Sequence, residues 1–151
     1  MARMNIFEAL RVSHQTQREL AARLLASLND DAQRQQIFVD LKRELAAHET
    51  AEERCFYVPL FEHDVTVDAA RHGIAEHHEM DEMVESLEEM EPGSAQWRDC
   101  VRQLCEKIEH HLSEEEHKFF QEAGKVLTET QKTALAKEYE TEFTTLRVKE
   151  G

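Results

Sequence analysis

Glycine and proline are scarce in this sequence, which has four glycines and two prolines among 151 residues. Because both residues interrupt regular secondary structure, their scarcity excludes a loop-rich architecture and, with 33% charged residues, favours long helices with few turns. A chain of this length can form one domain with a real core. No linker or low-complexity segment divides it, so we expect a single domain over residues 1–151.

Cysteines and long apolar runs are lacking as well. The three cysteines, Cys55, Cys100 and Cys105, form no paired framework, which excludes a disulfide scaffold, argues against structural zinc and favours a reducing compartment. The first ten residues, MARMNIFEAL, lack the apolar run of a signal peptide, and no segment approaches transmembrane length. We therefore expect a cytoplasmic protein that does not enter a membrane. Cys55 is interpreted as a small buried filler rather than a redox group.

Positive charge is in short supply. Lysine and arginine number 18 against 32 acidic residues, which gives a formal net charge of −14. This excess argues against nucleic acid or an anionic membrane as a partner. A solvated acidic surface is the simplest interpretation, although it also attracts cations. No motif in the sequence names a protein partner.

Apolar residues recur at alternating three- and four-residue steps, the pattern of helices with one buried face. Short connections between such helices make neighbours antiparallel, so the predicted fold is all-α, an up-down-up-down four-helix bundle over about residues 5–124. An additional amphipathic C-terminal helix is predicted over about residues 128–149, packing outside the bundle or fraying. The four bundle helices are predicted at about residues 5–28, 31–57, 66–90 and 94–124.

Helix boundaries have recognisable signals. Asp30 and Ser94 are good N-cap residues, and Ser94 follows the turn residues Glu91, Pro92 and Gly93. Pro59 should end or kink the second helix, because proline lacks an amide hydrogen and clashes with the preceding turn. Thr128 and Gln131 have the spacing of a weak capping box at the start of the C-terminal helix.

Histidines and glutamates form one pattern that occurs twice. Shifting the numbers of His14, His48 and Glu52 by 63 gives a second set of the same residue types, and apolar positions such as Leu41 and Leu104 share this offset. Self-similarity of this kind indicates two helical hairpins of common design. The second set is His77, His111 and Glu115.

The spacing of these residues suits a pair of metal ions. His48 and Glu52 are four residues apart, as are His111 and Glu115, so each pair lies on one helix face. The imidazole can then bind one metal while the carboxylate reaches a second. Iron or manganese suits imidazole and carboxylate ligands, and zinc is possible. Burying six such groups without a metal would cost of the order of several kcal/mol.

Other polar residues leave alternatives open. A single histidine on an apolar face is more often a satisfied core residue than a ligand, and a register using His110 with Glu114 would break the offset of 63. Asp81 could be an additional ligand, although it drifts off the buried face. Glu53 and Glu116 could orient ligands or simply be exposed. His78 and His110 are expected at the surface or in contact with a ligand residue, and the other three histidines at the surface or in turns: His63, His72 and His117.

A pocket for a small ligand is predicted beside the metal ligands. Gln17 and Met80 lie one turn from His14 and His77, and aromatic residues follow the two glutamates. The aromatic residues are interpreted mainly as core, which would also exclude water and control gas access. The predicted lining residues are Gln17, Met80, Phe56 and Phe119.

The pattern H…HxxxE…H…HxxxE, with the strings AAHETAEERCFYVP, AEHHEMDEM and EHHLSEEEHKFF, resembles the hemerythrin-like (HHE cation-binding) family. The resemblance covers about residues 5–124. It implies an antiparallel bundle holding two iron ions, with an oxo or hydroxo bridge and two bridging carboxylates, and the duplicated histidines and glutamates as ligands. Oxygen-carrying hemerythrins differ, since they place two histidines four apart on the third helix and HxxxxD on the fourth. Here Gly73 and Asp81 flank His77, so the pattern is closer to iron–sulfur-repair di-iron proteins and iron-sensing domains.

The resemblance implies a non-haem di-iron protein that binds O2, NO or a related oxidant as a sensor, scavenger or carrier. Two alternatives remain. One is an enzyme that turns over peroxide or NO, or that delivers iron for repair of iron–sulfur centres. The other is a metal-gated interaction module whose C-terminal helix meets a partner. A binding protein is favoured over an enzyme, because no additional general acid or base is apparent beside the ligands.

Overall fold

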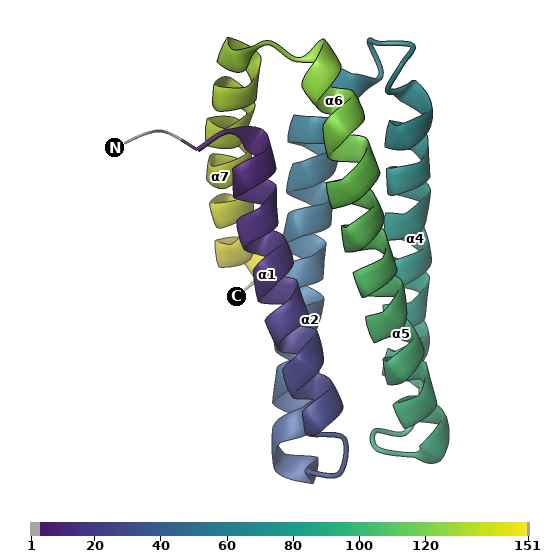
Figure 1. Ribbon diagram of the computed structural model, residues 1–151. Helices are drawn as coiled ribbons and strands as arrows, with labels where there is room; N and C mark the ends of the chain where they lie inside the picture. Colours follow the sequence, from purple (N-terminus) through teal and green to yellow (C-terminus); the bar gives the residue numbers. More distant parts are fainter. Residues whose placement is uncertain (1–3, 151) are drawn as a thin grey trace.

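The computed structural model describes residues 4–150, and these contain helices and no strand. Four long helices run antiparallel in a bundle (Figure 1), which confirms the predicted all-α fold. Their connections are short, so neighbours in sequence are neighbours in space. The four helices are α1 (Ile6–Ala26), α2 (Asp31–Glu52), α4 (Val67–Glu89) and α5 (Ala95–Glu114).

Two of these helices continue through π-helical segments that the sequence did not predict. α2 runs through η1 (Glu53–Tyr57) into the short α3 (Val58–Leu60), and α5 runs through η2 (Glu115–Phe119) into α6 (Phe120–Val126). A π-helical turn holds more residues than an α-helical one, so it rotates the side chains that follow it. Three consecutive residues, 55 to 57, are buried here as a result.

Capping side chains fix where the helices begin. Asn5 and Glu8 form a capping box at α1, while the side chains of Asp30 and Ser94 accept backbone N–H groups at α2 and α5. Gly93 has a φ of 81°, which suits the turn before Ser94. Pro59 lies inside α3, which ends one residue later, so the stop predicted there is confirmed.

The apolar core forms two clusters, one at each end of the bundle. Leu24, Leu87 and Trp97 belong to the cluster near the α1–α2 and α4–α5 connections. Ile6 and Phe56 belong to the other. The duplicated histidines and glutamates fall between the clusters, and they are buried almost completely. Packed side chains on both sides therefore hold this polar level in place.

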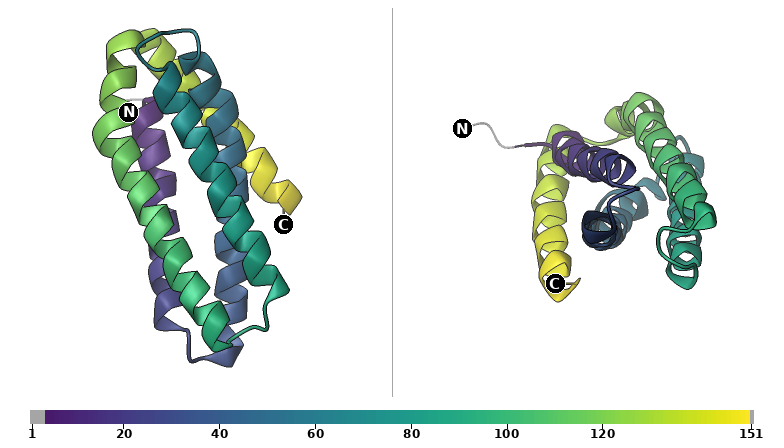
Figure 2. Two further views of the ribbon diagram at one scale, coloured as in Figure 1. Left: turned by 90° about the vertical axis from the view of Figure 1, so that its right-hand side faces the viewer. Right: turned by 90° about the horizontal axis from the view of Figure 1, so that it is seen from below.

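A further helix, α7 (Glu129–Glu150), packs against α1 and α2 outside the bundle (Figure 2), so the predicted C-terminal helix is confirmed. Thr128 and Gln131 make the predicted capping box, with hydrogen bonds of 2.8 and 3.1 Å. Ala136 and Tyr139 of α7 join the apolar cluster at residues 6 and 56. Among residues 4–150, no helix has the length and apolar character needed to cross a bilayer.

Candidate metal centre

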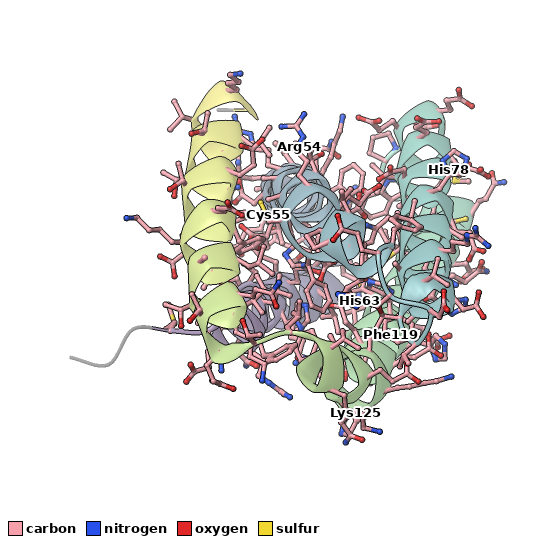
Figure 3. The ribbon with its side chains drawn as sticks, turned by 90° about the horizontal axis from the view of Figure 1, so that it is seen from above. Arg54, Cys55, His63, His78, Phe119 and Lys125 are labelled. Carbon is pink, nitrogen blue, oxygen red and sulfur yellow. The ribbon has the colours of Figure 1, made fainter. Side chains whose placement is uncertain are left out.

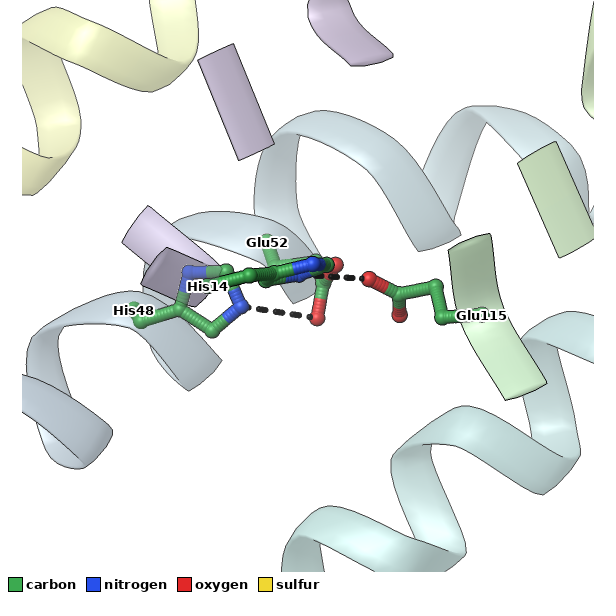
Figure 4. Close-up of side chains that lie close together, drawn as sticks. All are labelled: His14, His48, Glu52 and Glu115. Carbon is green, nitrogen blue, oxygen red and sulfur yellow. Dashed lines mark ion pairs between the residues drawn. The ribbon is translucent and has the colours of Figure 1, made fainter. Parts of the chain in front are cut away.

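Four bundle helices carry the duplicated residues to one level. α1 contributes one histidine, α2 a histidine and a glutamate, α4 one histidine, and α5 with η2 a histidine and a glutamate. Each of these residues is at most 2% exposed. Figure 4 shows four of them converging from α1, α2 and η2. The six are His14, His48, Glu52, His77, His111 and Glu115.

Each glutamate lies between two histidines. Glu52 Oε1 is 3.4 Å from His48 Nε2 and 3.0 Å from His77 Nε2. Glu115 contacts His14 Nε2 at 3.0 Å through Oε1 and His111 Nε2 at 3.6 Å through Oε2. The two carboxylates therefore link all four imidazoles at the centre of the bundle.

The potential ligand atoms form two groups that share Glu52. One group combines His14, His48, Glu52 and Glu115, and the other combines Glu52, His77 and His111, with all ligand atoms of a group within 4.8 Å of one another. A residue common to both groups is placed as a bridging carboxylate would be. Ligand atoms about 2.1 Å from one metal lie about 3 Å apart when adjacent, which matches the closest contacts here.

The inner atoms of this set lack hydrogen bonds. All four histidine Nε2 atoms, both oxygens of Glu52 and Oε1 of Glu115 are buried without a hydrogen-bond partner. Buried polar atoms are normally satisfied, so seven unpartnered atoms pointing at one another require an explanation. Two metal ions would satisfy them, and the donor set of four imidazoles and two carboxylates fits iron or manganese.

The outer nitrogens of the histidines are all engaged. His14 Nδ1 lies 2.7 Å from Glu116 Oε2, His77 Nδ1 3.2 Å from Glu53 Oε2, and His111 Nδ1 2.8 Å from Glu76 Oε1. An ionised carboxylate only accepts, so Nδ1–H donates, and Nε2 is the inward-facing nitrogen that can bind a metal once it carries no proton. The fourth, His48 Nδ1, lies 2.7 Å from the Tyr139 hydroxyl.

The offset of 63 relates two of these four contacts to each other, but it does not relate the other two. The offset of 63 relates the Glu53–His77 contact to the Glu116–His14 contact. It also relates Glu76 to Ser13, whose side chain is too short to play the same part. Tyr139 takes the place of the missing carboxylate, since its hydroxyl lies 2.6 Å from Ser13 Oγ and also contacts His48 Nδ1. α7 thus completes the surroundings of the site at the position where the two halves differ.

Tyr57 is a further polar group at the centre. Its hydroxyl donates a hydrogen bond to Glu115 Oε2, and its ring lies 5.5 Å from the ring of His77. Burial, together with the charges of Glu115 and Glu52, raises the pKa of Tyr57 well above its usual value, so the hydroxyl keeps its proton. From the sequence, this residue was interpreted mainly as core.

Gly73 makes room for Tyr57. A Cβ at position 73 would lie 2.4 Å from the Tyr57 ring and hydroxyl, so Gly73→Ala should destabilise the fold by at least about 1 kcal/mol. Gly124 in α6 is the matched control, because a Cβ there meets nothing within 4 Å. Gly124→Ala should stabilise the protein by roughly 0.5–1 kcal/mol. Chemical denaturation of both variants measures the difference, and equal effects would contradict it.

Electrostatics set the protonation of the centre. Burial alone would lower the pKa of His14, but the carboxylates of Glu115 and Glu116 outweigh it and raise the pKa to about 9. Burial lowers the pKa of His48 to about 4. For Glu115, burial and the neighbouring Glu52 raise the pKa to about 7. The metal-free centre therefore holds protons that ligation must displace.

Metal binding should release protons and tighten as the pH rises. At pH 7 a pKa of about 9 leaves His14 protonated and a pKa of about 7 leaves Glu115 half protonated, whereas a ligand must be deprotonated. We expect at least one proton released per chain, and about tenfold weaker binding per pH unit below 7 for each displaced proton. Calorimetry in buffers of different ionisation enthalpy counts these protons. Binding without proton release would contradict this protonation state.

Glu116 is held by two arginines. Arg18 donates to both of its oxygens at 2.9 and 3.1 Å, and Arg11 lies 3.9 Å away. Burial favours the neutral acid, yet the contacts with His14 and Arg18 hold the pKa of Glu116 at about 2. Glu116 therefore remains an ionised acceptor for His14 Nδ1–H.

The predicted pocket residues are buried in different surroundings. Gln17, Met80 and Phe56 are at most 2% exposed, and Gln17 Nε2 has no hydrogen-bond partner. Phe119 instead lies against His72, with ring centroids 5.9 Å apart, while Phe120 stacks on His14 at the same distance. The π-helical segment η2 rotates the side chains that follow it, so Phe120, and not Phe119, lies against His14.

The other sequence candidates lie away from the centre. Asp81 is exposed and neighbours Glu49. The side chains of His78 and His110 are 74% and 63% exposed, and His78 points outward from α4 (Figure 3). The structure thus brings together the register with His111 and Glu115 rather than the register with His110 and Glu114.

The three cysteines are free thiols. Cys55 is buried between η1 and α7 (Figure 3), and Cys105 is buried near α1. Burial raises the pKa of both thiols to about 11, which keeps them protonated and favours packing over a redox role. Cys100 is half-buried.

An antiparallel helical bundle with a buried centre of four histidines and two glutamates defines a class of cation-binding bundle proteins. Residues 5–123 match the family model described as the Hemerythrin HHE cation binding domain, and the chain belongs to this family. The match ends before α7, so Tyr139 lies outside it.

One relative illustrates how far the similarity extends. A protein named DNA nickase, from Nostoc sp. (strain PCC 7120 / SAG 25.82 / UTEX 2576), is 29% identical over 117 residues. The aligned region is 78% of this chain and 33% of that protein, so the chain spans about a third of the relative's length. No solved structure is significantly similar to the chain.

Proposed function

We propose that the protein is a non-haem di-iron protein that binds O2, NO or a related oxidant at a carboxylate-bridged centre. The observation that supports this most directly is the set of seven buried, unpartnered nitrogen and oxygen atoms converging between the helices. Six side chains cannot fill two octahedral coordination spheres, so positions remain for small ligands. When bound, two redox metals of this kind would supply reversible one-electron chemistry and a place for a diatomic or peroxide ligand.

The chain's own residues would prepare that site in two ways. Glu53, Glu76 and Glu116 fix the imidazoles through Nδ1. Phe56 and Phe120, buried beside Tyr57 and His14, exclude water from one side of the centre. These groups orient the ligands and keep the surroundings dry, which suits capture of a small apolar molecule.

Metal analysis tests this proposal. We expect about two irons per chain after gentle aerobic purification, with a visible absorption band that changes when oxygen is removed. Less than about one metal per chain would contradict the proposal. Manganese or zinc in place of iron would support a metal centre and contradict the assignment of iron, and zinc would also contradict oxidant chemistry because it has no redox chemistry.

An enzyme is the second candidate. The Tyr57 hydroxyl lies against Glu115 Oε2 and keeps its proton, so it is a hydrogen-bond donor at the centre that the sequence pattern did not indicate. Such a donor could orient bound peroxide or NO for turnover. Stopped-flow measurements separate the two candidates, because an enzyme consumes many equivalents of oxidant, whereas a sensor or carrier reacts stoichiometrically. Iron delivery for iron–sulfur repair would instead appear as transfer of the metal to an acceptor.

Two further assignments complete the proposal. The contact between Tyr139 of α7 and His48 links the C-terminal helix to the centre, as a metal-gated interaction module would need. The activity named for the Nostoc relative is not carried over, because that similarity covers a third of the relative and this chain carries a net charge of −14. Nucleic acid is therefore not proposed as a partner.

A further inference from the structure

The two halves of the bundle present different outer faces. α7 covers the face formed by α1 and α2, and it lies away from the face formed by α4 and α5 (Figure 2). Near the level of the metal centre, the covered face carries four small, buried residues, and the offset of 63 gives their counterparts on the other face. The small residues are Ala9, Ser13, Ala47 and Ala51. The counterparts are His72, Glu76, His110 and Glu114.

All four counterparts are of metal-binding type, and they form two HxxxE pairs. His72 and Glu76 lie one turn apart on α4, and His110 and Glu114 lie one turn apart on α5. The pairs also meet across the helices, since His72 Nε2 is 2.8 Å from Glu114 Oε1. His110 Nε2 is 3.8 Å from Glu76 Oε2. The face of α1 and α2 that α7 covers therefore carries small side chains, whereas the face of α4 and α5 carries imidazoles and carboxylates.

The cluster is accessible but partly unsatisfied. The side chains of His72 and His110 are 52% and 63% exposed, whereas Glu76 is 3% exposed. Glu114 Oε1 is buried and has no hydrogen-bond partner, although His72 Nε2 is close. A carboxylate oxygen that accepts no hydrogen bond, beside an exposed imidazole, is placed to bind a cation arriving from solvent.

We propose that His72, Glu76 and Glu114, with His110 closing a fourth side, form a second, solvent-facing site for a divalent cation of the zinc class. One ligand atom from each of His72, Glu76 and Glu114 falls within 4.8 Å of the others. A mixed set of imidazole and carboxylate ligands is one that Zn2+ takes in proteins. The site lies outside the buried centre and contacts it only through Glu76, and the inference does not depend on the proposed function.

Lys107 is the local competitor of such a cation. Its Nζ lies 3.3 Å from Glu76 Oε2 and 2.6 Å from Glu79. A bound cation would be repelled by this ammonium group, which predicts modest affinity and ready release. Glu76 Oε1 also accepts from His111 Nδ1, so the second site and the buried centre share one carboxylate. A cation bound at the solvent-facing site would therefore alter the hydrogen bond between Glu76 and His111 of the buried centre.

Counting bound Zn2+ in His72→Ala tests the proposal. The native protein and the variant are dialysed against micromolar Zn2+, and the bound metal is measured by elemental analysis. We expect the variant to bind about one Zn2+ per chain less than the native protein. His78→Ala is the matched control, because His78 pairs with Glu82 at 2.8 Å on the same helix with the same spacing. It should bind as much Zn2+ as the native protein.

Equal Zn2+ binding by His72→Ala and the native protein would overturn the proposal, and so would an equal loss in His78→Ala. Because the result is a difference between variants, it stands whether or not the buried centre holds iron. Lys107→Gln adds an opposite effect, since removing the neighbouring positive charge should tighten Zn2+ binding about two- to fivefold. Weaker binding in Lys107→Gln would contradict the assigned position of the cation.

Discussion

Replacing Glu52 by glutamine should remove most of the metal from the protein. Glu52 belongs to both groups of convergent ligand atoms, so its loss would affect metal bound at either group. Glutamine keeps the shape of the side chain but replaces one oxygen with an NH2 group that binds no cation, and it removes one of two negative charges at the centre. For the proposed content of about two irons per chain, we expect the variant to hold less than one. Elemental analysis of the purified variant measures this directly.

Stability supplies a second measurement of the same change. A metal that binds only the folded state at 100 times its dissociation constant stabilises a protein by about 2.7 kcal/mol, and this gain should vanish in Glu52→Gln. Glu82→Gln is the control, because Glu82 also pairs with a histidine one turn away, at the surface. Unchanged iron content in Glu52→Gln, with circular dichroism showing an intact bundle, would contradict the bridging position of Glu52.

The helices and the six convergent residues could be anticipated because they depend on local spacing. His48 and Glu52 share a helix face at four residues apart in any α-helix, whatever surrounds them. The offset of 63 then selected His77 over His78 and His111 over His110, and the structure brings the selected residues together. The fold class could be predicted from composition for a similar reason. Glycine and proline interrupt helices locally, and this sequence contains few of either.

The π-helical segments escaped sequence reasoning because they depend on tertiary packing. Both occur at the glutamates of the centre, η1 directly after Glu52 and η2 beginning at Glu115. Each gives up regular hydrogen bonding, and the packing at the centre has to offset that cost. Their effect is visible at Phe120, which stacks on His14 where a regular register would have favoured Phe119. The helix propensities of individual residues do not indicate where a π-helical turn will rotate the side chains.

Among the residues that contact the histidine Nδ1 atoms, two could be found from the sequence and two could not. Glu53 and Glu116 adjoin the two glutamates of the repeat, so the duplication itself pointed to them. Glu76 could not be found by the repeat, because its counterpart is Ser13. Tyr139 is 91 residues from the histidine that it contacts and lies in a helix outside the duplicated region. Contacts between distant segments of this kind become visible only when the packing of α7 is known.

Tyr139 gives the second large expected effect. Tyr139→Phe removes the hydroxyl that lies 2.7 Å from His48 Nδ1 while keeping the ring that packs against Phe143. The imidazole of His48 would lose the contact that fixes its orientation and its tautomer. Loss of such an outer partner typically weakens metal binding by 10- to 100-fold, so we expect an increase of about that size in the dissociation constant. Competition with a chelator of known affinity measures it.

Ser13→Ala separates the metal effect from a loss of packing. It removes the 2.6 Å contact at the other side of the Tyr139 hydroxyl but leaves the contact with His48 in place. We therefore expect a much smaller change in metal affinity, with a loss of stability of about 1 kcal/mol for the missing hydrogen bond. If Tyr139→Phe and Ser13→Ala weaken metal binding equally, the hydroxyl acts through the packing of α7. A selective loss in Tyr139→Phe would show that a helix outside the duplicated bundle tunes one ligand of the centre.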